Sequence, residues 1–177
     1  MPNVRHVIRY FSSLLLCLSV ANNLLADEAS LSDLAKQNQQ QCLTSAANYF
    51  SLSTDILLAI RDVEGAWTGA RLTNKNKSVD HGIMGINSVW EKALNKRGIT
   101  LQQVAENDCL SIWVGAWILA NYLYEADAYT DDPSPSKYWR GIGYYNSHTT
   151  ALNEKYALKV WQKMIARQQQ AETKENN

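Results

Sequence analysis

The sequence has few of the residues that mark linker-rich, basic or disordered chains. Three prolines and eight glycines in 177 residues are too few for a collagen-like or linker-rich architecture. The 17 basic and 17 acidic residues cancel, so the chain lacks the positive field of a nucleic-acid-binding protein. With 46% hydrophobic and 19% charged residues, it is not an intrinsically disordered chain. Its length fits one domain with terminal segments.

Phenylalanine is scarce: the chain has two, against six tryptophans and nine tyrosines. Tryptophan and tyrosine combine a flat apolar face with a polar tip, which suits amphipathic ligands such as sugars as well as an ordinary core. Trp113, Trp117 and Trp161 fall in helical apolar stripes, so we expect them in the core. Trp67 and Trp90 flank a polar segment and are candidates for lining a cleft.

Residues 1–26 have the pattern of a secretory signal peptide. Basic residues precede an apolar stretch over residues 10–20, and Ala21 and Ala26 are candidate cleavage sites. That stretch is shorter than the ~20 residues that a membrane-spanning helix needs. We therefore predict an exported mature chain with no stable membrane span.

Few cysteines remain once this segment is removed, because Cys17 lies within it. Cys42 and Cys109 are an even pair in an oxidising compartment, which favours a disulfide over two buried free thiols. His81 and His148 have no third ligand at a suitable spacing, so we expect no metal site and no cofactor.

Apolar residues recur at helical spacing along most of the mature chain. Ser88 with Glu91, and Thr100 with Gln103, are candidate capping boxes at helix starts. Gly65 is a candidate helix stop. The expected helices cover about 53–65, 88–96, a short stretch after residue 100, 108–125 and 152–165.

The segments between these helices are polar. Residues 67–87 fit a loop or small hairpin, and the two prolines of residues 131–137 predict a loop. The chain shows neither an internal repeat nor a second domain. We predict a polar lead-in over residues 27–40, one domain over residues 41–166, and a flexible polar tail over residues 167–177.

Glu64 is the first candidate for chemistry. We expect it in the last turn of a helix, near the apolar Ile60 and before Trp67. The negative end of the helix dipole and apolar surroundings both raise the pKa of a carboxyl, toward the value a general acid needs near neutral pH. The alternative is a surface glutamate paired with a neighbouring charge.

Three short motifs resemble, in order, those of the lysozyme-like lytic transglycosylase (SLT-domain) family. They lie at residues 63–65 (Val-Glu-Gly), 82–87 (Gly-Ile-Met-Gly-Ile-Asn) and 144–146 (Tyr-Tyr-Asn). The resemblance extends over about residues 42–164, and is greatest to the small members of type III and type IV secretion, conjugation and pilus systems. It implies a mainly α (α+β) lysozyme-like fold: a helical domain with a small irregular or β insert between helices and an active-site cleft.

The resemblance also implies a periplasmic enzyme that cleaves the β-1,4 bond between N-acetylmuramic acid and N-acetylglucosamine and forms a 1,6-anhydro product. Glu64 would be the general acid and base, and Tyr145 would hold it by a hydrogen bond. Asn146 belongs to the same motif, and Met84 and Asn87 would line the cleft. The implied partners are peptidoglycan glycan strands and a secretion, conjugation or pilus assembly.

Two residues depart from the family pattern: Gly65 replaces the usual serine and Gly85 the usual glutamine. The loss of two polar groups implies a weaker or altered grip on the glycan, or room for a bulkier ligand at Gly85. A non-catalytic glycan-binding subunit of a secretion apparatus is therefore an alternative.

Asp80 leaves another alternative open. Its surroundings in the sequence resemble those of the second carboxylate in animal-type lysozymes, so a glycoside hydrolase using Glu64 and Asp80 is possible. Asp80 ordering the hairpin through backbone hydrogen bonds is the interpretation that the sequence favours.

Overall fold

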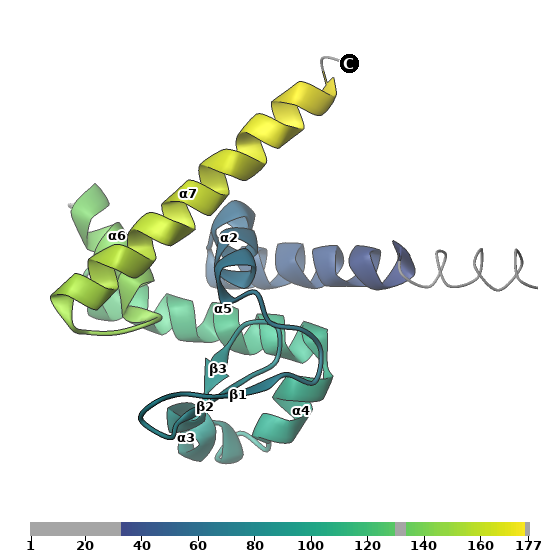
Figure 1. The fold of residues 1–177 in the computed structure, drawn as a ribbon, viewed down its shortest axis with the longest axis vertical. Helices are drawn as coiled ribbons and strands as arrows, with labels where there is room; N and C mark the ends of the chain where they lie inside the picture. Colours follow the sequence, from purple (N-terminus) through teal and green to yellow (C-terminus); the bar gives the residue numbers. More distant parts are fainter. Residues whose placement is uncertain (1–32, 130–133, 176–177) are drawn as a thin grey trace, which may run out of the picture. The chain divides into compact units, whose positions relative to one another are not determined.

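A computed structural model describes residues 33–129 and 134–175 (Figure 1). The predicted signal peptide lies outside the described residues. The chain divides into residues 1–38 and 39–177. Residues 33–38 of the first unit are helical, as are residues 39–50 of the second. The second unit then contains α2 (Thr54–Glu64), β1 (Arg71–Thr73), β2 (Val79–His81), β3 (Ile86–Asn87), the 3-10 helix η1 (Ser88–Trp90), α3 (Glu91–Asn95), α4 (Leu101–Glu106), α5 (Asp108–Glu125), α6 (Pro135–Tyr144) and α7 (Thr150–Glu175).

This architecture confirms the predicted mainly α, lysozyme-like fold with a small β insert. The helix α7 packs against α2 and α6, and α5 packs against α6 (Figure 1). The largest fully buried side chains of the core are Leu43, Leu57, Ile60, Met84, Ile86, Leu94, Val104, Ile112, Leu119, Leu123, Ile142 and Val160.

The insert is a three-stranded antiparallel sheet in the order β1-β2-β3, where the sequence predicted a loop or small hairpin. Arg71 pairs with His81, and Asp80 pairs with Asn87. Residues directly opposite each other in an antiparallel pair share one face of the sheet. This register therefore brings Asp80 and Asn87 together on one side of the insert.

Several helix ends follow their local sequence. The helix α5 has the predicted bounds, and α2 ends at Gly65, whose φ of 61° is left-handed, a conformation that glycine adopts without strain. Thr100 and Gln103 form the expected capping box. Ser53 precedes α2 but makes no side-chain capping bond.

The predicted capping box of Ser88 and Glu91 is wrong. The Ser88 hydroxyl accepts a hydrogen bond from the Val79 N–H at 3.0 Å and so fastens η1 to the sheet. The Asn87 side chain caps η1 by accepting from the Val89 N–H. Asn87 and Ser88 are both residue types that cap helices. Because Ser88 bonds to β2, Asn87 is the one that caps η1.

The helix α6 begins inside the segment that was predicted to be a loop. Pro135 occupies its first turn, where the missing N–H has no helical partner to lose. The Ser134 side chain caps it by accepting from the Lys137 N–H at 3.3 Å. The sequence predicted a loop at Pro135, but this proline is the first residue of a helix.

Both terminal segments are more helical than the sequence predicted. The helix α7 continues past the expected end at Ile165 to Glu175, through exposed glutamine, alanine, glutamate and lysine residues that favour helix. Residues 33–40, within the predicted lead-in, are also helical. The domain boundaries at residues 41 and 166 stay predictions.

A disulfide joins Cys42 to Cys109, with 5.4 Å between their Cα atoms. It links the helix over residues 39–50 to the first turn of α5. Closing a loop of 67 residues restricts the unfolded chain and stabilises the fold by about 4 kcal/mol in the chain-entropy description. Within residues 33–129 and 134–175, every helix is too short or too polar to cross a membrane.

Candidate active site

A cleft of about 600 Å³ lies beside the sheet, within the size range of ligand sites. Glu64 reaches it from the end of α2, and Asp80 and Asn87 from the sheet. Tyr145 and Asn146 reach it from the turn after α6. The remaining lining residues are Asn74, Lys75, Asn76, Ser78, Gly85, Val89, Trp90, Tyr122, Tyr144, Ser147, His148 and Leu152.

Glu64 has a carboxyl that is largely withdrawn from water, although the residue as a whole is partly exposed. Burial is the main cause that raises its pKa from the usual 4.5 to about 7, and the negative charge of Asp80 adds to the rise. A hydrogen bond from Tyr156 and the positive charge of Lys159 oppose it. A carboxyl with this pKa carries a proton in about half of the molecules at neutral pH.

Tyr156, on α7, holds the Glu64 carboxyl. Its hydroxyl donates to Glu64 Oε1 at 2.5 Å. Burial, together with the nearby Glu64 charge, keeps the Tyr156 pKa well above its usual 10, so the phenol stays a neutral donor. Because Oε1 is occupied, Oε2 is the oxygen of Glu64 that is left to carry a proton.

Tyr145, which the resemblance assigned to holding Glu64, has a different partner. Its hydroxyl donates to the Met84 carbonyl at 3.0 Å. The Tyr145 and Tyr156 rings stack with 6.2 Å between centroids and an angle of 12° between their planes. Tyr145 thus supports the turn before β3 and buttresses Tyr156, while Tyr156 makes the bond to Glu64.

Gly85 lies against the Glu64 carboxyl. A Cβ atom added at Gly85 would be 2.9 Å from Glu64 Cδ and would overlap Oε2. The φ of Gly85 is 60°, so the backbone conformation also favours glycine. Glu64 therefore occupies the place that a side chain at residue 85 would take.

Asp80 is fixed by two amide donors. Asn74 Nδ2 donates to its Oδ2 at 2.8 Å, and Asn87 Nδ2 donates to its Oδ1 at 2.6 Å. The same two amides donate to the Ser78 hydroxyl. Asp80 thus orders the hairpin, as the sequence favoured, but it does so through side-chain amides rather than the expected backbone hydrogen bonds. Asp80 also lines the same cleft as Glu64.

The structure brings together most of the residues that the sequence singled out. Six of them line the cleft: Glu64, Asp80, Gly85, Asn87, Tyr145 and Asn146. Met84 does not, because its side chain is fully buried and packs beside Gly115. Gly65 does not either; it caps α2 and lines a separate hollow with Trp67.

The tryptophans divide differently from the prediction. Trp90 lines the cleft, whereas Trp67 is 62% exposed in the separate hollow. Trp113 and Trp117 pack against the core as expected, but Trp161 is 45% exposed. Trp161 lies on α7 but is not part of its buried stripe, which is formed by Asn153, Tyr156, Ala157 and Val160.

Sequence reasoning missed Tyr156, which donates to Glu64, and Asn74, which donates to Asp80. Tyr156 sits on the buried stripe of α7, and a hydroxyl on such a stripe needs a polar partner. That is the signal that was available, although it does not name the partner.

In the described part of the chain, no group of three histidine, cysteine or acidic residues is arranged to hold a metal ion.

Comparison with known sequences gives several relatives, although no family model matches the chain. Invasion protein IagB of Salmonella typhimurium is 32% identical over 126 residues, which cover 68% of this chain and 73% of IagB. Protein IpgF of Shigella flexneri is 27% identical over 139 residues, covering 77% and 86% of the two chains. A peptidoglycan-binding-like protein of Escherichia coli O157:H7 is 29% identical over 132 residues, covering 68% and 74%.

Proposed function

The chain belongs to the family of the invasion protein IagB, and on that premise we propose that it is a peptidoglycan lytic transglycosylase with Glu64 as its general acid and base. One observation carries the proposal. The Glu64 carboxyl is at a cleft, has one oxygen occupied by Tyr156, and has a pKa of about 7. An acid of this kind can donate a proton near neutral pH and take one back afterwards.

The first step is protonation of the glycosidic oxygen. Oε2 of Glu64 gives its proton to the β-1,4 oxygen between N-acetylmuramic acid and N-acetylglucosamine. The bond from that oxygen to C1 breaks, and the 2-acetamido oxygen of the N-acetylmuramic acid stabilises the cation at C1. Tyr156 stays hydrogen-bonded to Oε1 and steadies the carboxylate that forms.

The second step closes a ring within the same sugar. The Glu64 carboxylate removes the proton from the C6 hydroxyl, whose oxygen attacks C1 and forms the 1,6-anhydro bond. The proton count balances, since Glu64 ends as it began. The attack is intramolecular, so proximity replaces an activated water, and one carboxylate is enough.

We place this reaction in the periplasm, at the wall that a secretion, conjugation or pilus assembly has to pass. The signal-peptide pattern of residues 1–26 and the disulfide of Cys42 and Cys109 support export. One relative is named for invasion and another for a likeness to peptidoglycan-binding proteins, and both names agree with such a role.

A second candidate is a hydrolase of the lysozyme type. Asp80 lines the same cleft, and its charge is one of the causes that raise the Glu64 pKa. In that reaction Asp80 stabilises the cation or attacks C1, and water completes the cleavage. The product then has a reducing end, which a 1,6-anhydro product lacks.

Digestion of purified peptidoglycan, followed by mass analysis, tests the proposal. The mature protein is compared with Glu64→Gln and with Glu172→Gln, an exposed control near the end of α7. Anhydro products from the wild type and the control, with none from Glu64→Gln, support the proposal. Reducing ends would move the reaction to hydrolysis. Glycan that stays intact but sediments with all three proteins would instead indicate a binding subunit.

A further inference from the structure

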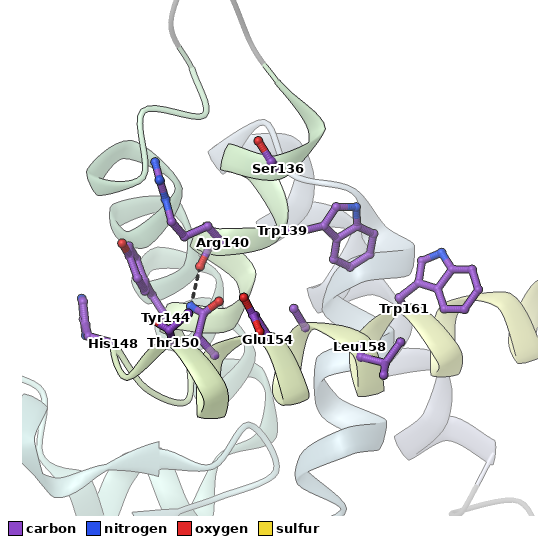
Figure 2. A pocket seen from close by; sticks show the side chains of 11 residues that line it. Ser136, Trp139, Arg140, Tyr144, His148, Thr150, Glu154, Leu158 and Trp161 are labelled. Carbon is purple, nitrogen blue, oxygen red and sulfur yellow. Dashed lines mark hydrogen bonds between the residues drawn. The ribbon is translucent and has the colours of Figure 1, made fainter.

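A second groove of about 520 Å³ lies between α6 and α7 (Figure 2). Trp139 reaches it from α6, and Leu158 and Trp161 from α7. Leu158 is 52% exposed and Trp161 is 45% exposed, although both are large apolar side chains. An exposed apolar surface rimmed by polar groups is typical of a binding site.

One acidic side chain lies in this groove. Glu154, Leu158 and Trp161 are spaced i, i+4, i+7 along α7, so they share one helix face. The Glu154 carboxylate makes no hydrogen bond or ion pair with the described residues. In Figure 2 its carboxylate lies between the Tyr144 end of the groove and the two indoles.

The other ionisable groups around the groove are engaged elsewhere. The Arg140 guanidinium donates to the Ala126 carbonyl at 2.9 Å and points away from the tryptophans in Figure 2. His148 is paired with Glu125 at 2.9 Å. The groove therefore combines an apolar floor with a carboxylate, and suits a ligand with an aliphatic chain that ends in a cation.

The groove continues from the active-site cleft. Tyr144 and His148 line both hollows, and their rings stack with 4.3 Å between centroids. Figure 2 shows this stack at one end of the groove and Trp161 at the other. A branched substrate in the cleft can therefore place one branch across the stack and along α7.

We propose that this groove binds the stem peptide of peptidoglycan through the amine-bearing side chain of its diamino acid; the choice of ligand rests on the proposed function. The aliphatic part of that side chain packs on Leu158 and the indoles. Its ammonium group pairs with Glu154 beside the aromatic faces, which also attract cations. A neutral sugar in the groove would give the Glu154 carboxylate no cation to pair with.

Titration with a free stem tripeptide whose diamino acid is lysine, so that the side chain ends in an ammonium group with no carboxylate beside it, tests the groove without catalysis. The full mature chain is labelled with 15N, and the indole N–H signals of Trp139 and Trp161 are assigned from single Trp→Phe variants. The tripeptide is expected to shift both signals. Acetylation of its side-chain amine, or Glu154→Gln, weakens binding by about threefold to tenfold. The control Glu172→Gln leaves binding unchanged.

Three results would overturn the inference. They are no shift of either indole, equal affinity for the acetylated peptide, and the same loss in Glu172→Gln as in Glu154→Gln. If the peptide causes no shift but a neutral chitin tetrasaccharide does, the groove is a sugar site.

Cleavage assays separate this inference from the proposed function. On glycan strands that carry stem peptides, Glu154→Gln is expected to raise KM by about threefold to tenfold with little change in kcat. On strands stripped of peptide, it leaves KM unchanged. Peptide binding without cleavage of either strand would overturn the proposed function alone. Cleavage of both kinds of strand without peptide binding would overturn only the inference about the groove.

Discussion

The Tyr156 hydroxyl donates a 2.5 Å hydrogen bond to Oε1 of Glu64, although 92 residues separate the two in the sequence. This bond favours the charged carboxylate, while burial of the carboxyl favours the neutral acid. The Glu64 pKa of about 7 is the outcome of these opposed effects. A side chain that both gives and takes a proton needs such a balance.

Replacing Tyr156 with phenylalanine removes a hydrogen bond that lowers the Glu64 pKa. The pKa therefore rises in Tyr156→Phe, and activity, which needs protonated Glu64, persists to higher pH. The alkaline limb of the kcat/KM profile should move to higher pH, while kcat falls because the carboxyl is less well positioned. An alkaline limb that stays in place would show that Tyr156 does not set the titration of Glu64.

Replacing Asp80 with asparagine should move the same limb in the opposite direction. The negative charge of Asp80 raises the Glu64 pKa, so its removal lowers that pKa and activity is lost at lower pH. A transglycosylase retains turnover in Asp80→Asn, since its reaction uses one carboxylate. A loss of turnover at every pH, in a variant that keeps the wild-type free energy of unfolding, would favour the hydrolase. Asp55→Asn, at an exposed residue of α2, is the control.

Local signals predicted much of the fold. The bounds of α5, the end of α2 at Gly65 and the capping box at Thr100 each depend on residues within a few positions of one another. The start of α6 at Pro135 was missed because a proline is compatible with both a loop and a first helical turn. Here the local sequence permitted both outcomes, and packing against α5 and α7 favoured the helix.

The sequence predicted several residues of the site, but not the hydrogen bonds between them. The motifs named Glu64, Asn87 and Tyr145, which all line the cleft. The partly buried Tyr145 and the buried Tyr156 stack beside Glu64, and the packing of α7 against α2 decides which hydroxyl reaches it. Glu64 and Tyr156 are 92 residues apart, so no short sequence pattern links them. Tyr156 was missed for this reason.

Glu64→Gln should stabilise the protein at alkaline pH. The folded pKa is about 7, above the usual 4.5, so the contribution of Glu64 to stability is fully present below pH 4.5 and is lost as the pH rises through 7. Glutamine cannot ionise and avoids this loss. The free energy of unfolding at pH 8 should therefore rise by about 1–3 kcal/mol in Glu64→Gln, and by little at pH 4.5. Urea denaturation at both pH values measures the difference. An equal gain at both would show that ionisation is not its cause.

Gly85→Ala should impair catalysis more than folding. The added methyl group overlaps Glu64 Oε2, so the carboxyl has to move, and a displacement of about 1 Å can reduce turnover by roughly 100-fold. Gly98→Ala is the matched control, because Gly98 has a φ of 72° and open space around its added Cβ. Both variants carry the backbone strain, about 1–2 kcal/mol, of a left-handed alanine. Equal kcat in the two variants would contradict the role assigned to Gly85.

The protonation state of Glu64 at neutral pH can be measured by titrating its side chain. The side-chain carboxyl carbon is followed by 13C NMR in the mature protein from pH 4 to pH 9, and the signal missing from Glu64→Gln identifies it. We expect a midpoint near pH 7. A midpoint near 4.5 would mean that Glu64 is an ordinary ionised carboxylate at neutral pH, and would contradict its role as the acid.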